Sequence, residues 1–100
     1  MKNHQLKTDP YVFDSVWNNN KNFEIRKNDR DFRCGDLLIL SETVFSGEEI
    51  AAGKPLELTG RVMTATVKYV LYGPQYGLID GWCIMSIDNV IRYDSKNECN

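Results

Sequence analysis

Three charged residues stand close together in one short segment, as Lys21-x-x-Glu24-x-Arg26. They belong to a thirteen-residue stretch, 21–33, that holds five basic and three acidic side chains and therefore carries a net charge of +2. Such a segment could hold a phosphate or the polar edge of a base through charge-assisted hydrogen bonds. The alternative is a solvated hairpin tip with interleaved ion pairs, each of which contributes little. Charge alone favours the surface hairpin.

Alternation along the same segment predicts how these side chains are displayed. Phe23 and Ile25 alternate with Glu24 and Arg26, which is the period of a half-buried strand. We expect Phe23 and Ile25 to face the core, and Glu24 and Arg26 to project from the opposite face. Lys21 would lie beside them where a helix meets the strand. If this face lines a cleft, Glu24 would hold the two cations in place and could accept a proton.

The elements that must position these residues follow from similar patterns. Asp9 can cap a helix that starts at Pro10 and ends at 18–20. This helix has an apolar stripe of Phe13, Val16 and Trp17. Strands are expected over 4–8, 23–26, 37–40, 61–72 and 82–87, the last with an extension to 90–91. In strand 61–72 one face should carry Met63, Ala65, Val67, Tyr69 and Leu71. Residues 43–58 predict a long loop with a helical turn over 48–52.

These elements predict an α+β, mostly β protein of one domain. A sheet of five or six strands in 100 residues tends to curl and close on itself. We expect a small, mostly antiparallel β-barrel with an N-terminal helix that plugs or flanks it; a flat α+β sheet is the alternative. The domain should span residues 1–93, and residues 94–100 should form a flexible C-terminal tail.

Composition excludes several classes of function. The net charge of −2 argues against a protein that coats a polyanion. Three cysteines without a Cys-x-x-Cys pair and one histidine make a structural zinc site implausible, and we expect no metal or other cofactor. The start of the chain is polar and no apolar run could span a membrane, so we expect a cytoplasmic protein with no membrane partner. We also expect a monomer.

The spacing Lys21-x-x-Glu24-x-Arg26 is similar to the G-x-K-x-x-E-x-R signature of the ASCH superfamily of PUA-like β-barrels, with Asn19 at the glycine. The chain resembles, within it, a small uncharacterised bacterial and phage family. The matching stretches are 4–7, 21–32, 34–36, 40–42, 59–61, 67–71 and 80–87. A related branch, the small acetylcytidine amidohydrolases, has a threonine where this chain has Glu24, so their mechanism does not transfer.

The resemblance implies a PUA-like barrel whose cleft binds RNA or a nucleotide-like ligand. The implied site residues are Lys21, Glu24 and Arg26, with Lys27 and Arg30 at the rim. Two more residues belong to the matching start of the chain. His4 would be either a phosphate ligand or general base near the cleft, or an exposed strand histidine. Lys7 would be a phosphate contact at the rim or a plain surface lysine.

Aromatic and sulfur-containing residues are assigned mainly to structure. Trp17 lies on the helical stripe and Trp82 opens an apolar strand, so both are expected in the core rather than stacked on a base. Tyr72 is the better candidate for an exposed aromatic side chain. Cys34 and Cys83 are expected to be small core residues, and Cys99 to be exposed in the tail.

Three functions remain open. The first is a module that binds RNA or a nucleotide through Lys21, Glu24 and Arg26. The second is a hydrolase or ribonuclease that acts on RNA or a modified nucleoside, with Glu24 as general base and Lys21 stabilising negative charge. The third is a protein-interaction factor without nucleic-acid binding, whose contact would be the acidic loop 43–58.

Overall fold

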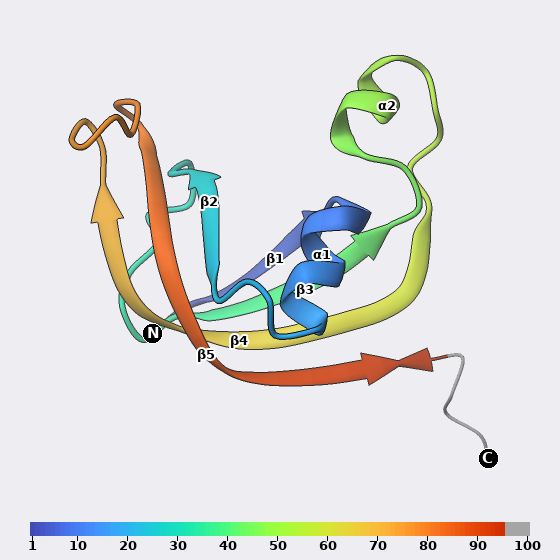
Figure 1. Ribbon diagram of the computed structural model, residues 1–100, viewed down its shortest axis with the longest axis horizontal. Helices are drawn as coiled ribbons and strands as arrows, with labels where there is room; N and C mark the ends of the chain where they lie inside the picture. Colours follow the sequence, from blue (N-terminus) through green and yellow to red (C-terminus); the bar gives the residue numbers. More distant parts are fainter. Residues whose placement is uncertain (96–100) are drawn as a thin grey trace.

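The computed structural model describes residues 1–95 and contains five strands and two short helices (Figure 1). In chain order these are β1 (Asn3–Thr8), α1 (Pro10–Trp17), β2 (Phe23–Lys27), β3 (Leu37–Thr43), α2 (Gly47–Ala51), β4 (Leu58–Tyr72) and β5 (Trp82–Asp94). The expected helical turn after β3 is therefore present as α2. No helix within the described residues is long and apolar enough to cross a membrane.

All five strands form one sheet in the order β1-β3-β4-β5-β2. Only the β1–β3 pair is parallel, and the other three pairs are antiparallel. The sheet curls into a half-barrel, so that the two edge strands, β1 and β2, turn toward each other (Figure 1). The prediction of a small, mostly antiparallel, curled sheet with an N-terminal helix is confirmed.

The first helix, α1, begins and ends as the sequence indicates. Pro10 occupies its first turn, and Phe13 and Val16 are buried in the core. Asn19 follows the helix with φ 64°, so asparagine adopts the left-handed conformation that the glycine of the signature would favour. Asp9 precedes the helix but does not cap it. Its carboxylate instead accepts the backbone N–H of Gly47 at 2.8 Å and so fastens α2 to the start of α1.

The core fills the inside of the curl. Alternate residues of the central strands point inward and are buried, among them Met63, Ala65 and Val67 of β4. Tyr69 breaks the expected face and is exposed. The register between β4 and β5 shifts between Val67 and Tyr69, which reverses the alternation, so that Val70 packs against the core instead.

The predicted faces of β2 are inverted. Glu24 is buried with only 2% of its surface exposed, whereas Ile25 is 48% exposed and Phe23 also faces solvent. The expectation that Phe23 and Ile25 face the core is therefore wrong. Glu24 and Arg26 do share a face, as predicted, but it is the inner one. At the β2 edge of the sheet, the inner face is therefore filled by Glu24 and its hydrogen-bond partners rather than by apolar side chains.

Other differences concern single residues. The structure contradicts a core position for Cys34, which is exposed, whereas Cys83 is buried and burial raises the pKa of its thiol. Tyr72 is exposed as expected, and its hydroxyl donates to the carbonyl of Phe32. The predicted tail begins at Asp94, which is the last residue of β5. Its remainder beyond Ser95, including Cys99, lies outside the described residues.

His4 is buried beside Asp36, so it is not an exposed strand histidine. Its other expected role, as a phosphate ligand or general base, stays a prediction. Its Nε2 lies 2.8 Å from Asp36 Oδ2, and its ring packs edge-on against Phe32. Burial by itself would raise the pKa of Asp36. Hydrogen bonds from His4 and from the backbone N–H groups of Lys2 and Arg33 outweigh it, and the pKa lies below its usual value. This cluster ties β1 to the segment that precedes β3.

We predict that Asp36→Asn lowers the free energy of unfolding by about 2 kcal/mol at pH 7, because charge-assisted hydrogen bonds are lost. A lowered pKa in the folded state stabilises the protein above the unfolded-state pKa, and this contribution is lost as the pH falls through the folded-state pKa. Urea unfolding at pH 7 and at pH 3 measures the difference, which should shrink in acid. The exposed Asp31→Asn is the control. An equal difference at both pH values would contradict the assignment.

Candidate functional site

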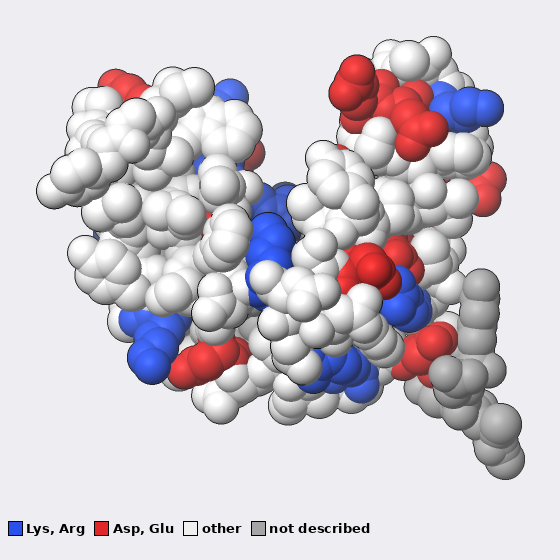
Figure 2. All heavy atoms as spheres, viewed as in Figure 1, with Lys and Arg blue, Asp and Glu red and all other residues white. Residues whose placement is uncertain are grey.

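A concave groove of about 570 Å³ lies between the edge strands β1 and β2. We call it the β1–β2 groove. Its walls come from residues 5–9 on one side and residues 24–27 on the other. The rest of the lining consists of Val12, Lys21, Asp29, Arg30, Phe32 and Trp82. In the space-filling view the surface is hollowed between two lobes, and basic side chains lie at the bottom of the hollow (Figure 2).

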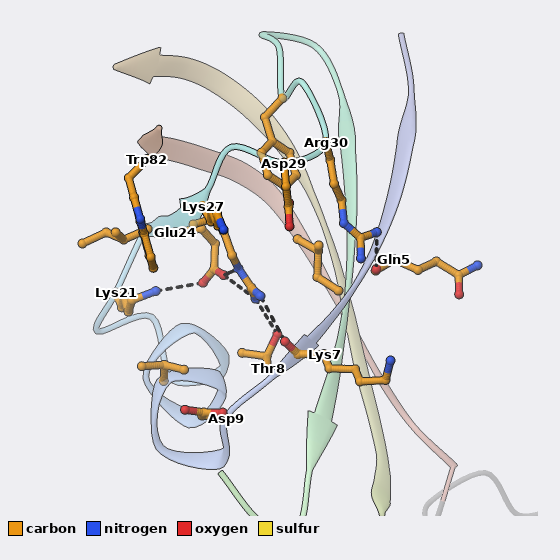
Figure 3. A pocket seen from close by; sticks show the side chains of 15 residues that line it. Gln5, Lys7, Thr8, Asp9, Lys21, Glu24, Lys27, Asp29, Arg30 and Trp82 are labelled. Atoms are coloured by element: carbon orange, nitrogen blue, oxygen red, sulfur yellow. Dashed lines mark hydrogen bonds and ion pairs between the residues drawn. The ribbon is translucent and has the colours of Figure 1, made fainter. Parts of the chain in front are cut away.

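Glu24 is the central acceptor of the groove (Figure 3). Lys21 Nζ donates to its Oε2 at 2.8 Å, and Arg26 donates to its Oε1 from Nε at 3.1 Å and from Nη2 at 2.9 Å. Both carboxylate oxygens are thus occupied by cations. Because Glu24 is buried, these bonds compensate the cost of removing its charge from water. We call Lys21, Glu24 and Arg26 the clamp.

Arg26 also reaches across the open side of the half-barrel. Its Nη1 donates to the main-chain oxygen of Lys7 at 3.0 Å, and its Nη2 donates to Thr8 Oγ1 at 3.0 Å. Arg30 repeats this arrangement further along, where Nη1 donates to the main-chain oxygen of Gln5 at 3.0 Å. Strands β1 and β2 are not hydrogen-bonded to each other as a ladder. The guanidinium groups of Arg26 and Arg30 therefore connect the two edge strands, and the groove lies in the gap between these strands.

The remaining cations of the groove are available to a ligand. The lining carries five basic and three acidic side chains. Lys7 and Lys27 are exposed, and neither ammonium group makes a hydrogen bond or ion pair within residues 1–95. Arg30 is exposed and uses only part of its guanidinium on Gln5. Lys7, Lys27 and Arg30 can thus contact an anion without breaking the clamp. The structure brings together every predicted site residue except His4.

Trp82 contradicts its expected position in the core. It is 38% exposed and lines the groove opposite β1. Trp82 pairs with Lys27 at the end of the β2–β5 ladder, where the sheet no longer covers it. Trp82 directly follows Gly81 and is the first residue of its strand, and this position was the sequence feature that could have indicated its exposure. Trp17, in contrast, packs beside Phe13 against the core, as expected.

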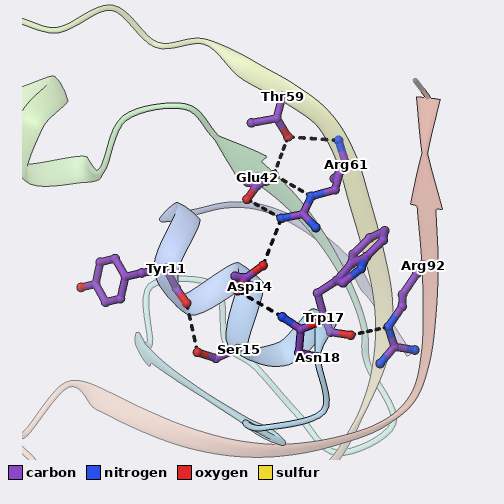
Figure 4. A network of polar contacts seen from close by, with 9 residues as sticks. All are labelled: Tyr11, Asp14, Ser15, Trp17, Asn18, Glu42, Thr59, Arg61 and Arg92. Atoms are coloured by element: carbon purple, nitrogen blue, oxygen red, sulfur yellow. Dashed lines mark hydrogen bonds and ion pairs between the residues drawn. The ribbon is translucent and has the colours of Figure 1, made fainter. Parts of the chain in front are cut away.

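A second, partly buried ion pair, which the sequence did not indicate, lies apart from the groove lining and fixes α1 (Figure 4). Arg61 Nη2 and Glu42 Oε2 are 2.9 Å apart, and Arg61 also approaches Asp14 of α1 at 3.5 Å. A hydrogen bond to Glu42 is the main cause that raises the pKa of Arg61. The guanidinium lies over the rings of Phe13 and Trp17. This network fastens the helix that contributes Val12 to the groove lining.

The described residues contain no group of three His, Cys, Asp or Glu side chains that could hold a metal ion. The groove instead combines cations, an aromatic ring and hydrogen-bonding groups, which suits a polar organic anion. Residues 3–87 match the family described as Domain of unknown function (DUF3850). The chain therefore belongs to this family. A comparison with curated proteins gave no match.

The clamp makes a direct prediction about stability. Arg26→Ala should lower the free energy of unfolding by about 3 kcal/mol, because it leaves the buried Glu24 carboxylate short of a partner. Lys27→Ala, at the next position of the same strand, removes a free surface cation and should change it by less than about 0.5 kcal/mol. Chemical denaturation of both variants measures the two effects. Similar losses for both would show that Arg26 does not hold the edges together.

Proposed function

We propose that the β1–β2 groove binds RNA or a nucleotide-like ligand. The observation that carries the proposal is the position of three available cations, Lys7, Lys27 and Arg30, around a concave site that also contains Trp82. Phosphate oxygens are good acceptors for such cations, and bases stack on exposed aromatic rings. A cavity of about 570 Å³ falls within the range of small-molecule sites and is suited to one nucleotide at a time.

We further propose that this family is a branch of the ASCH superfamily of PUA-like barrels. Two features support the relationship. The Lys-x-x-Glu-x-Arg spacing places Lys21, Glu24 and Arg26 in one groove, and the curled sheet with α1 beside it has the shape expected of such a barrel. The two edge strands remain separate here, so the barrel is closed by side chains.

Electrostatics favour single-stranded nucleic acid over duplex. The chain has a net charge of −2, and the excess of positive charge is local to the groove. A duplex binder needs a broad basic surface, whereas a groove of this size contacts few phosphates. Unstacked bases of a single strand can enter a concave site, and their edges are then accessible.

Hydrolysis is the alternative function, with Glu24 as general base. In the free protein both oxygens of Glu24 accept hydrogen bonds from Lys21 and Arg26, so the carboxylate would have to exchange one of them before accepting a proton. This arrangement favours a role in holding the site. Incubation of labelled RNA and N-acylated nucleosides with the wild type and with Glu24→Gln separates the two functions. Turnover by the wild type that Glu24→Gln abolishes, with its fold intact, would establish catalysis.

The binding proposal predicts that each free cation contributes a modest share of the RNA affinity and of its salt dependence. Lys27→Ala and Arg30→Ala should each weaken binding of a short single-stranded RNA about fivefold at 0.1 M salt, and each should lower the salt slope by about 0.7. Lys68→Ala is the matched control, because Lys68 is exposed and lies outside the groove lining. Amide-shift titrations measure the affinities.

Shifts at residues 5–9 and 21–30 are expected in the wild type. If RNA, DNA and nucleosides all gave no shifts there at millimolar concentration, the proposal would be wrong. The acidic loop around α2 would then be the next surface to test, with Glu48 and Glu49 reversed to lysine and a search for a protein partner.

A further inference from the structure

Of the three carboxylates that line the groove, Asp29 differs from Glu24 and Asp9 in its hydrogen bonding. Glu24 is held by Lys21 and Arg26, and Asp9 accepts the backbone N–H of Gly47. Asp29 accepts no hydrogen bond and forms no ion pair within the described part of the chain, although Arg30 follows it directly in sequence. An ionised carboxylate is an acceptor only, so Asp29 presents two oxygens to whatever enters the groove.

Asp29 is directed toward the groove rather than away from the protein. In the close view its carboxylate points into the space between β1 and β2, near the end where Arg30 reaches Gln5 (Figure 3). Its charge also acts on Cys83, a buried residue of β5. Burial raises the pKa of the Cys83 thiol, and the nearby Asp29 raises it further. A carboxylate that faces the interior of an otherwise basic site would repel a phosphate but would attract N–H donors.

Trp82 is a second feature of the groove that suits a base. It lines the same groove at the β2 wall, beside Lys27 in the strand ladder. Apolar side chains of Leu6, Val12 and Phe32 also line the groove. A flat heterocycle can stack on the indole and place its polar edge against a carboxylate acceptor. A bare phosphate uses neither of these groups.

We infer that the groove selects a guanine nucleotide unit, with the base stacked on Trp82 and its edge donating to Asp29. Guanine presents two adjacent N–H donors on its pairing edge, which match the two oxygens of one carboxylate. Adenine and cytosine offer an amino group beside a ring acceptor, and uracil places carbonyl oxygens on both sides of its single N–H. The phosphate would then contact Lys7, Lys27 and Arg30. This inference rests on the proposed function and adds the base and its two contacts.

The test is a titration of the full chain with GMP and UMP, and with short single-stranded RNAs containing or lacking guanine. The two arms separate a free nucleotide from a strand as the source of the same unit. We expect GMP, or the guanine-containing strand, to bind about tenfold more tightly than its uracil counterpart. The indole N–H resonance of Trp82 should shift on binding, whereas that of Trp17 should not, because Trp17 packs against the core.

Variants assign the two contacts separately. Asp29→Asn should reduce the guanine preference to within about twofold, and Asp31→Asn, an exposed neighbour outside the groove lining, should keep it. Trp82→Leu should weaken both nucleotides about tenfold, and Trp82→Phe should restore most of the affinity.

Equal binding of GMP and UMP by the wild type would overturn the inference and leave the proposed function standing. So would a preference that Asp29→Asn retains. Absence of binding by every nucleotide and RNA would overturn both.

Discussion

The buried carboxylate of Glu24 and the guanidinium of Arg26 determine the shape of this protein at its open side. A curled five-stranded sheet must either close its edges with a ladder of backbone hydrogen bonds or leave them apart. Here Arg26 binds Glu24 on its own strand and the backbone of β1 across the gap. A buried ion pair contributes little net stability compared with an apolar pair of similar size, but it is costly to break. The effect of this ion pair is to hold β1 and β2 at a distance that leaves room for the groove between them.

This arrangement divides the charged residues of the groove into two sets. Lys21 and Arg26 are largely occupied by Glu24 and the backbone, so they maintain the site. Lys7, Lys27 and Arg30 lie at the exposed edge with donors to spare. The residues that make the most recognisable sequence pattern are therefore not the ones best placed to hold a ligand. Arg61 and Glu42 act in the same structural way on the other side of α1, where they anchor the helix that contributes Val12 to the groove wall.

The sequence predicts the strands well because alternation is a local property. It places Met63, Ala65 and Val67 on one face, and it finds α1 from its apolar stripe and the proline at its start. Alternation identifies the two faces of a strand but does not say which face is buried. For this reason the predicted orientation of β2 is the reverse of the observed one. The bulge before Tyr69, the exposure of Trp82 and the burial of His4 beside Asp36 depend on pairings between distant segments, which no local pattern encodes. The sequence spacing made it predictable that these charged side chains lie near one another, but not that they divide into clamp and free cations.

The outward orientation of Phe23 and Ile25 has a consequence for how β2 finds its place. A slip of one residue against β5 would turn these two apolar side chains inward and expose Glu24. Hydrophobic burial therefore opposes the native register of this strand, and the polar ties of Glu24 and Arg26 must outweigh it. The sheet carries a local conflict between patterning and pairing at β2, of the kind found where a fold gives up some stability for a site. An otherwise consistent sequence is frustrated at β2, one of the two strands that border the groove.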